Sequence, residues 1–194
     1  SMFKPMTPEE VEIKKKRVIA NREIIKDGLT NEQYKKCIDD GADPNASNGT
    51  PLNNAIKNDK IQEVEYLIRV GANPNLHESI KYAKDVNMIK VLCKNGAEID
   101  KITYSKYVSG DTDLLEYLLK ECDMDPNFDK GLIVRDAVNT NNVEVLRLFI
   151  KYGGDITIRQ NFPIRTASTK GNYEVIEELC KEYKRLRLSK NSEE

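Results

Sequence analysis

A short phrase recurs along this chain, and it constrains the fold more than any other feature. It first reads Gly41-Ala-Asp-Pro-Asn45, returns at Gly71, Gly96 and Gly153, and has a degenerate copy that begins at Cys122. Successive starts are therefore 30, 25, 26 and 31 residues apart, and each copy follows a Leu/Ile-rich stretch. Self-similarity at this period predicts a stacked array in which each unit buries its apolar face against its neighbours.

Composition excludes several classes of protein. The chain carries 31 Lys and Arg against 32 Asp and Glu, a formal net charge of −1. This balance argues against electrostatic capture of nucleic acid or of an anionic membrane. No apolar run approaches the roughly 20 residues of a membrane-spanning helix. No signal peptide is visible, so we expect neither a nucleic-acid partner nor a membrane partner.

The repeat sets the expected domain boundaries. Residues 1–29 comprise Ser1, which looks like the scar of a cleaved tag, and an N-terminal capping helix. Residues 30–183 form the repeat array, and residues 184–194 form a charged C-terminal tail. Thr7 with Glu10, and Thr30 with Gln33, match the capping-box pattern, so each pair predicts the start of a helix.

Each unit reads as two helices, and the middle of the array is the least regular part. Ala55, on the inner helix of one unit, lies 16 residues before Gly71, which closes that unit. In the next unit Ala83 lies only 13 residues before the closing Gly96. Because the stability of such an array sums unit and interface contributions, we expect residues 77–121 to open first.

The cysteines predict buried thiols. Cys37, Cys93 and Cys180 fall on apolar helix faces, Cys122 lies outside them, and no C-x-x-C pair occurs. One histidine cannot complete a zinc site with these cysteines at any familiar spacing, so no metal is expected. Unpaired cysteines fit a reducing compartment, so we expect an intracellular protein, cytoplasmic with a nuclear location left open.

Three motifs resemble the ankyrin repeat: the inner-helix Thr50-Pro-Leu-x-x-Ala55, the outer-helix Glu63-Val-x-x-Leu-Ile68, and the Gly-Ala-Asp-x-Asn phrase. The stretch from Gly153 to Ile176 looks most like the divergent ankyrin repeats of giant DNA viruses of amoebae. The resemblance implies an all-α solenoid of stacked helix-turn-helix repeats with short β-hairpin tips, and covers residues 30–183.

No residue pattern indicates catalysis. His77 is the only histidine, Gly110 and Gly131 are isolated, and the carboxylates are scattered. We therefore expect no enzyme activity and no cofactor. Two basic runs, 14–17 and 181–190, are interpreted as solvated helix surface, ahead of a nucleic-acid arm or a nuclear address.

The family resemblance implies a non-enzymatic protein-protein interaction module, in which partner proteins dock on a concave surface of hairpin tips and inner helices. For a viral protein the partner would belong to the infected host, and we expect a monomer. Phe128 and Arg159 lead as anchors, with packing against Ile133 and a solvated tip as their respective alternatives. The candidate partner-binding residues are Ser47, Lys57, Asn58, His77, Asp100, Lys101, Phe128, Asp129, Asn139, Arg159 and Lys170.

Other functions stay open at this point. An adaptor that recruits a target to ubiquitin or other host machinery is the main alternative, although only residues 186–194 follow the last repeat. A self-associating structural protein is another. Ankyrin tips also serve as substrates of an asparaginyl hydroxylase that reads a leucine eight residues upstream. Leu119 and Asn127 fit that spacing, so Asn127 is the candidate modification site.

Overall fold

Two helices begin at capping boxes, as the sequence predicts. A computed structural model describes residues 3–108 and 110–193. Helix α1 (Pro8–Ile24) starts after Thr7, whose Oγ1 accepts from the Glu10 N–H while the Glu10 carboxylate accepts from the Thr7 N–H. Helix α2 (Asn31–Asp39) starts after the same reciprocal pair made by Thr30 and Gln33. Both predicted capping boxes are confirmed.

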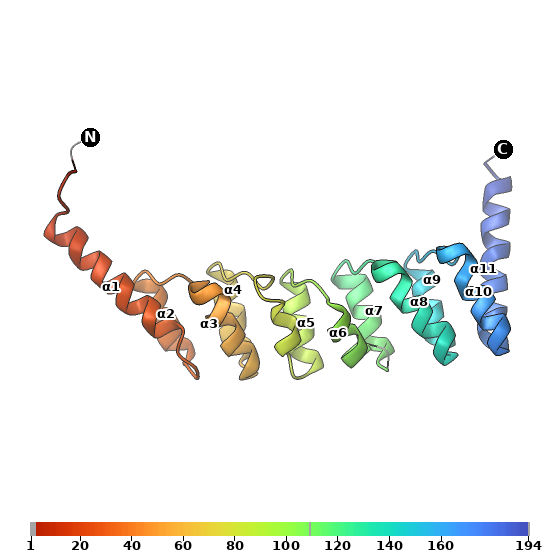
Figure 1. Ribbon diagram of the computed structural model, residues 1–194, viewed down its shortest axis with the longest axis horizontal. Helices are drawn as coiled ribbons and strands as arrows, with labels where there is room; N and C mark the ends of the chain where they lie inside the picture. The colour runs from red at the N-terminus through yellow and green to blue at the C-terminus, as the bar shows by residue number, and fades with distance from the viewer. Residues whose placement is uncertain (1–2, 109, 194) are drawn as a thin grey trace. The chain divides into compact units, whose positions relative to one another are not determined.

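The chain divides after Asp100 into two compact units. In the first unit an inner layer holds α1, α3 (Ala46–Lys57) and the 3₁₀ turn η1 (Ser79–Tyr82), and an outer layer holds α2, α4 (Ile61–Arg69) and α5 (Val86–Lys94) (Figure 1). Helix α3 contacts both α1 and η1, whereas α4 contacts both α2 and α5. Stacked helix pairs thus form two parallel layers, as the repeat period predicts.

The second unit repeats this plan. Its inner layer consists of α6 (Lys101–Thr103) with the π-helical turn η2 (Tyr104–Val108), then α8 (Phe128–Thr140) and α10 (Ile158–Lys170). Its outer layer consists of α7 (Thr112–Glu121), α9 (Val143–Lys151) and α11 (Tyr173–Asn191). Helix α8 contacts α10, and α9 contacts both α7 and α11. The inner alanines of both units are buried, which lets neighbouring inner elements approach closely.

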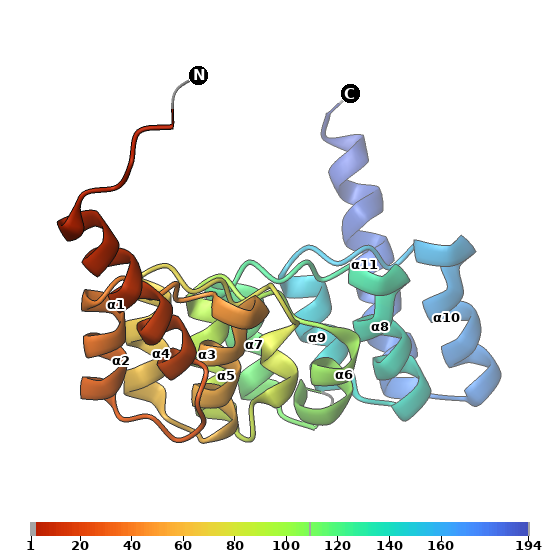
Figure 2. The same cartoon turned by 60° about the vertical axis from the view of Figure 1, so that its left-hand side comes forward.

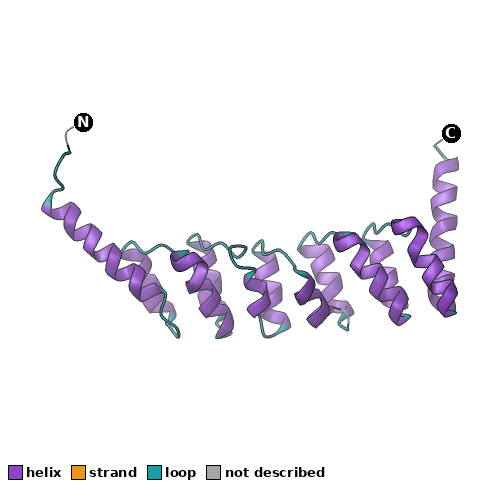
Figure 3. Ribbon diagram, in the orientation of Figure 1, coloured by secondary structure: helices purple, strands orange, loops and turns teal. Residues whose placement is uncertain are grey.

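The predicted β-hairpin tips are wrong. Within residues 3–108 and 110–193 every element is helical, and the tips are loops (Figure 3). Only residues 46–49 separate Asn45 from Thr50, too few for two paired strands and a turn. Ser47, Asn48 and Gly49 instead take left-handed φ values of 50°, 58° and 90° in the first turn of α3, and a right-handed helix follows them. Residues 129–131 and 159–161 do the same.

The irregular middle of the array is confirmed. Element η1 has 4 residues, α6 has 3 and η2 has 5, whereas α3 has 12 and α8 has 13. Ala83 is extended (ψ 131°), so the chain leaves η1 after one turn and enters α5 through the cap of Asp85. The shortened spacing before Gly96 therefore removes most of an inner helix.

None of the four cysteines, all of which lie in the described residues, forms a disulfide, but one of them departs from expectation. Cys37 and Cys93 are buried and Cys122 is half-buried, whereas Cys180 is exposed. The prediction of a buried thiol at Cys180 is wrong, because Cys180 lies on a side of α11 that the described residues leave uncovered.

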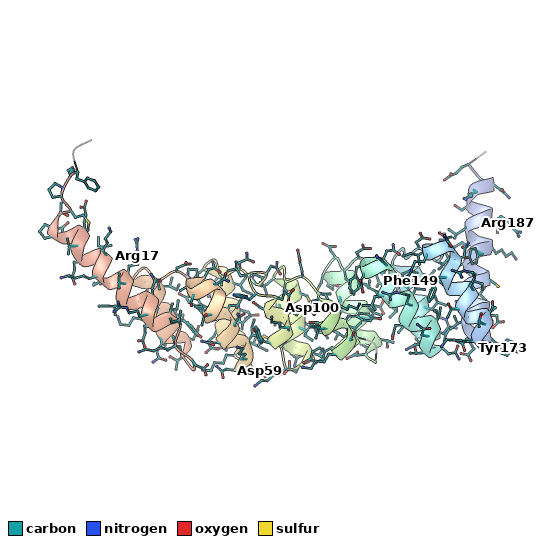
Figure 4. The ribbon with its side chains drawn as sticks, viewed as in Figure 1. Arg17, Asp59, Asp100, Phe149, Tyr173 and Arg187 are labelled. Carbon is teal, nitrogen blue, oxygen red and sulfur yellow. The ribbon has the colours of Figure 1, made fainter. Side chains whose placement is uncertain are left out.

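Helix α11 also includes residues 184–191, which we expected to form a charged tail. Its second half extends past the end of α10 in both views (Figures 1 and 2). Tyr173 and Arg187 lie toward opposite ends of this helix (Figure 4). Among the residues that the structure describes, no helix has the length and apolarity needed to cross a membrane.

Candidate functional site

Asparagine side chains hold neighbouring tips of the first unit together. Asn45 Nδ2 donates to the Gly71 carbonyl at 2.9 Å, and Asn45 Oδ1 accepts from the Asn73 N–H at 2.7 Å. Asn75 makes the same pair of bonds to the next tip, with the Gly96 carbonyl and the Glu98 N–H. Each carboxamide thus satisfies one donor and one acceptor of the neighbouring backbone, much as a strand would. We call this series of bonds the tip ladder.

The tip ladder continues in the second unit, where Asn127 Oδ1 accepts from the Asp155 N–H at 2.8 Å. The copies that begin at Gly96 and Gly153 have Asp100 and Thr157 where the others have asparagine. In the tips that end at Asn45, Asn75, Asn127 and Thr157, the Asp or Asn two residues earlier accepts from the backbone N–H of that residue, as Asp43 does from Asn45 at 2.9 Å. This is the asparagine or aspartate turn that the sequence predicts.

The residue after the ladder asparagine packs backward onto the preceding repeat. Leu76 follows Asn75, and a Cβ on Gly49 of the preceding repeat would lie 3.5 Å from it. Ile158 follows Thr157, and a Cβ on Gly131 of the preceding repeat would lie 3.1 Å from it. Phe128 holds the same place, and its ring meets the buried Tyr104 ring edge-on at 5.9 Å between centroids. Phe128 is half-buried there and packs on Tyr104. The repeated apolar residue at this position is a signal that sequence reasoning missed.

The other candidate residues at the tips lie in small clusters of polar and charged side chains. In the first unit Ser47 is exposed, and Asn48 Nδ2 lies 2.6 Å from His77 Nε2. In the second unit Asp129 lies 3.4 Å from both Lys101 and Arg135. The exposed Arg159 guanidinium stacks over the Phe162 ring, 5.7 Å from its centroid.

The remaining candidates lie at the other end of the inner helices. Lys57 Nζ sits 4.3 Å above the Tyr82 ring, and Asn58 Nδ2 donates to Asp27 Oδ1 at 2.7 Å. Lys170 Nζ donates to the Asn139 carbonyl at 3.4 Å. A helix of 12 residues is about 18 Å long, so these residues do not converge with the tips. Asp100, half-buried, closes the first unit.

Sequence reasoning also missed a polar cleft at the C-terminal end of α8. Asp136 lines an open cleft of about 450 Å³ together with Gly110, Thr140, Asn141, Asn142 and Val143. Asp136 Oδ2 is buried and has no hydrogen-bond partner, and burial raises the pKa of this carboxyl. Burial, followed by the Asp136 charge, raises the pKa of Tyr104, whose hydroxyl is also buried without a partner. The fold thus leaves two buried polar atoms without a hydrogen-bond partner beside or near this cleft.

The exposed clusters consist of groups that can bind another molecule. Within residues 3–108 and 110–193, no three His, Cys, Asp or Glu side chains gather in an arrangement that could hold a metal ion. The side chains at the tips are short polar groups, single cations and one cation stacked on a ring. Such groups suit hydrogen bonds and ion pairs with another molecule.

Comparisons with known proteins point to the same repeat. No family model and no solved structure matches the chain. It is 32% identical over 101 residues to an I-kappa-B like protein of Microplitis demolitor bracovirus, covering 50% of this chain and 53% of that protein. It is 29% identical over 128 residues to a putative ankyrin repeat protein of Acanthamoeba polyphaga mimivirus, covering 62% of this chain and 41% of that protein.

The chain thus spans about half the length of the viral relatives it matches. Both similarities agree with the recurring Gly-Ala-Asp-x-Asn phrase and with the helix pairs that stack in each unit. Together these observations show that the chain resembles the divergent ankyrin-repeat proteins of viruses.

Proposed function

We propose that this chain is a non-enzymatic protein-binding module, and that its partner docks on the tips and inner helices. The observation that carries the proposal is the tip ladder. Because Asn45 and Asn75 fix the tip backbones through side-chain bonds, exposed groups such as Ser47 and His77 are presented on an ordered frame. Ordered contact groups lose less conformational entropy on binding, so the same contacts yield more affinity.

In the second unit two cations favour an acidic contact on the partner. Arg159 is exposed, and its neighbour Arg165 is held in place by hydrogen bonds to the carbonyls of Arg159 and Gln160. An arginine that is already oriented pairs with a carboxylate in a bidentate geometry at little entropic cost. Phe128 contributes less to the proposed surface, because Tyr104 already covers part of its ring.

The two viral relatives support an intracellular setting for this binding, in which the partner is a protein of the infected host. The lack of a disulfide among the four described cysteines agrees with a reducing compartment. Within each unit the opposite ends of the inner helices offer a second candidate contact area away from the tips, at Lys57 in the first unit and at Lys170 in the second.

Site-specific photocrosslinking tests the proposal. A photoreactive residue is placed at Ser47 and Arg159 on the tips, at Lys57 and Lys170 on the other helix ends, and at Glu65 and Glu174 on outer helices. All six positions are exposed. After capture from candidate host cells, we expect crosslinks to one protein from the tip positions and none from the outer-helix positions. Crosslinks from the outer helices alone would reject the proposed surface.

A further inference from the structure

The outward face of α1 is apolar and uncovered. Val11, Val18 and Ile19 are 37%, 49% and 66% exposed. With Met6 and the stems of Lys14 and Lys15 they line an open groove of about 380 Å³. Helix α1 packs on its own unit through other residues, because its buried residues are Ala20 and Ile24. The groove is therefore not needed to hold α1 in place.

Among the described residues, two lysines and no carboxylate line this groove. An α-helix advances about 100° per residue, so Val18, Lys14, Lys15 and Arg22 all project within about 60° of the direction of Val11. The four glutamates of α1 project about 100° or more away from that direction; they are Glu9, Glu10, Glu12 and Glu23. The basic run 14–17 thus splits, and its first two lysines share a face with the exposed valines.

An exposed apolar stripe rimmed by charges of one sign marks a place where another molecule binds. The charge of the rim then indicates which molecule fits.

A second copy of the chain fits poorly. An antiparallel pairing that sets Val11 against Val18 of the other copy also sets Lys14 against Lys15, and a parallel pairing sets each lysine against itself. Because a two-fold interface brings the same patch together twice, every such arrangement opposes cations to cations. Like charges placed face to face disfavour association.

A lipid surface fits less well than a protein. Helices that lie in a membrane interface have a continuous apolar face and cations on the polar face. Here Lys14, Lys15 and Arg22 lie among the apolar residues, and the first turn carries Glu9 and Glu10. Cations interleaved with valines instead match a helix that carries carboxylates beside its own apolar residues.

We propose that the outward face of α1 binds an acidic amphipathic helix of another protein. Val11 and Val18 are two helical turns apart, about 10.5 Å along the axis, which matches apolar residues at positions i, i+3 or i+4, and i+7 of a docking helix. Asp and Glu beside those residues pair with Lys14, Lys15 and Arg22. This surface is separate from the tips, so a chain that holds one protein at its tips would be able to hold a second one here.

Two synthetic helical peptides test the proposal. They share apolar residues at positions i, i+4 and i+7, but carry either Glu or Lys on the flanking positions. We expect the Glu peptide to bind at least tenfold more tightly in fluorescence anisotropy, with a preference that falls as salt rises.

Matched variants locate the binding. Val18→Ser is expected to weaken the Glu peptide about tenfold, because a buried apolar contact is lost. Ile13→Ser removes an aliphatic that is 58% exposed on the opposite side of α1, and is expected to change nothing. The double variant Lys14→Glu, Lys15→Glu is expected to reverse the preference toward the Lys peptide, whereas Lys16→Glu is expected to preserve it. All these side chains are exposed, and thermal melting verifies that each variant folds.

Several outcomes would overturn the proposal. One is equal binding of both peptides, or no binding of the Glu peptide at its highest soluble concentration. A second is a concentration-dependent dimer in light scattering that Val18→Ser converts to a monomer, which would assign the face to a second copy. A third is sedimentation with phosphatidylserine vesicles without peptide binding, which would assign the face to a lipid surface. Arg159→Ala, a change at the tips, is expected to leave peptide binding unchanged.

Discussion

Gly154 and Phe149 are matched in size across the end of α9. A Cβ placed on Gly154 would lie 2.5 Å from three carbons of the buried Phe149 ring, and the Gly154 N–H donates to the Phe149 carbonyl at 2.8 Å. The other regular copies make the same backbone bond with alanine and a smaller partner. Those pairs are Ala42 with Cys37, Ala72 with Leu67, and Ala97 with Leu92. The second glycine of the Gly153-Gly154 phrase thus accommodates a larger core residue.

Gly154→Ala is expected to destabilise the chain by about 1–3 kcal/mol through overpacking. Phe149→Leu removes the ring, so the double variant is expected to lose less stability than the two single losses together. Urea unfolding of the four chains measures the coupling. Gly110→Ala serves as a control, because nothing lies within 4 Å of its added Cβ. Strict additivity of the two changes would contradict the size match.

The tip ladder makes a second prediction, at Asn45. Asn45→Ala is expected to cost about 1–3 kcal/mol, because the Asn73 N–H and the Gly71 carbonyl lose their partner. Asn45→Asp keeps the acceptor and loses the donor, so a smaller loss is expected. Thr157→Ala, at the last tip, is the matched control and is expected to cost less than either. Amide exchange of the Asn73 N–H provides an independent readout; unchanged protection in Asn45→Ala would refute the ladder.

The sequence predicts the repeat because glycine stops, capping boxes and apolar spacing act within one helix or between its immediate neighbours. The capping boxes at Thr7 and Thr30 are local patterns of this kind, and both are present. The shortened spacing before Gly96 is also visible in the sequence, because a missing length of chain shows in the numbering, although the sequence does not show that the inner element η1 is the part that is shortened.

The tips are predicted less well, because their bonds join residues that are far apart in sequence. The sequence predicts a turn at Asn45. Its hydrogen bond to the Gly71 carbonyl, 26 residues away, becomes visible only in the structure. The sequence predicts Phe128 as an exposed anchor, whereas the structure packs its ring against Tyr104. The Asp136 cleft leaves no pattern at all, because an orphaned oxygen is visible only in three dimensions.

Asn127 remains our candidate for hydroxylation, and its setting predicts the kinetics. Its Oδ1 accepts from Asp155, and Leu119, eight residues earlier, is buried. Both residues must therefore leave their places before an enzyme can read them. We expect a peptide spanning residues 115–135 to gain the mass of one oxygen faster than the folded chain. Equal rates, or no gain in either, would count against this site.

Hydrogen exchange is expected to be fastest in residues 77–121. Elements η1, α6 and η2 together replace two inner helices, so fewer helical bonds and buried contacts oppose local opening there. Helices α3 and α8 provide the comparison, since they are full-length inner helices in the same chain. Uniform protection across all inner elements would show that the short ones are as stable as the rest.

Asp136 predicts an unusual dependence of stability on pH. Burial raises the pKa of this carboxyl above its usual value of 3.8, so the folded chain binds the proton more tightly than the unfolded chain. Its favourable contribution is therefore complete below the unfolded pKa, and is lost as pH rises through the folded pKa. Asp136→Asn carries no charge, so we expect it to be more stable than the natural chain at neutral pH. That advantage should shrink in acid.

Glu116 supplies the control of opposite sign for Asp136. Hydrogen bonds from Lys151 and Tyr152 lower the pKa of the Glu116 carboxyl, so its contribution is present above the unfolded pKa and is lost as pH falls. Glu116→Gln should therefore be less stable than the natural chain at neutral pH and approach it in acid. Urea midpoints at about pH 3 and pH 7 separate the two cases. If Asp136→Asn proves less stable at neutral pH, the carboxylate must make a favourable interaction in the fold. Asp136 Oδ2 would then not be an oxygen without a partner.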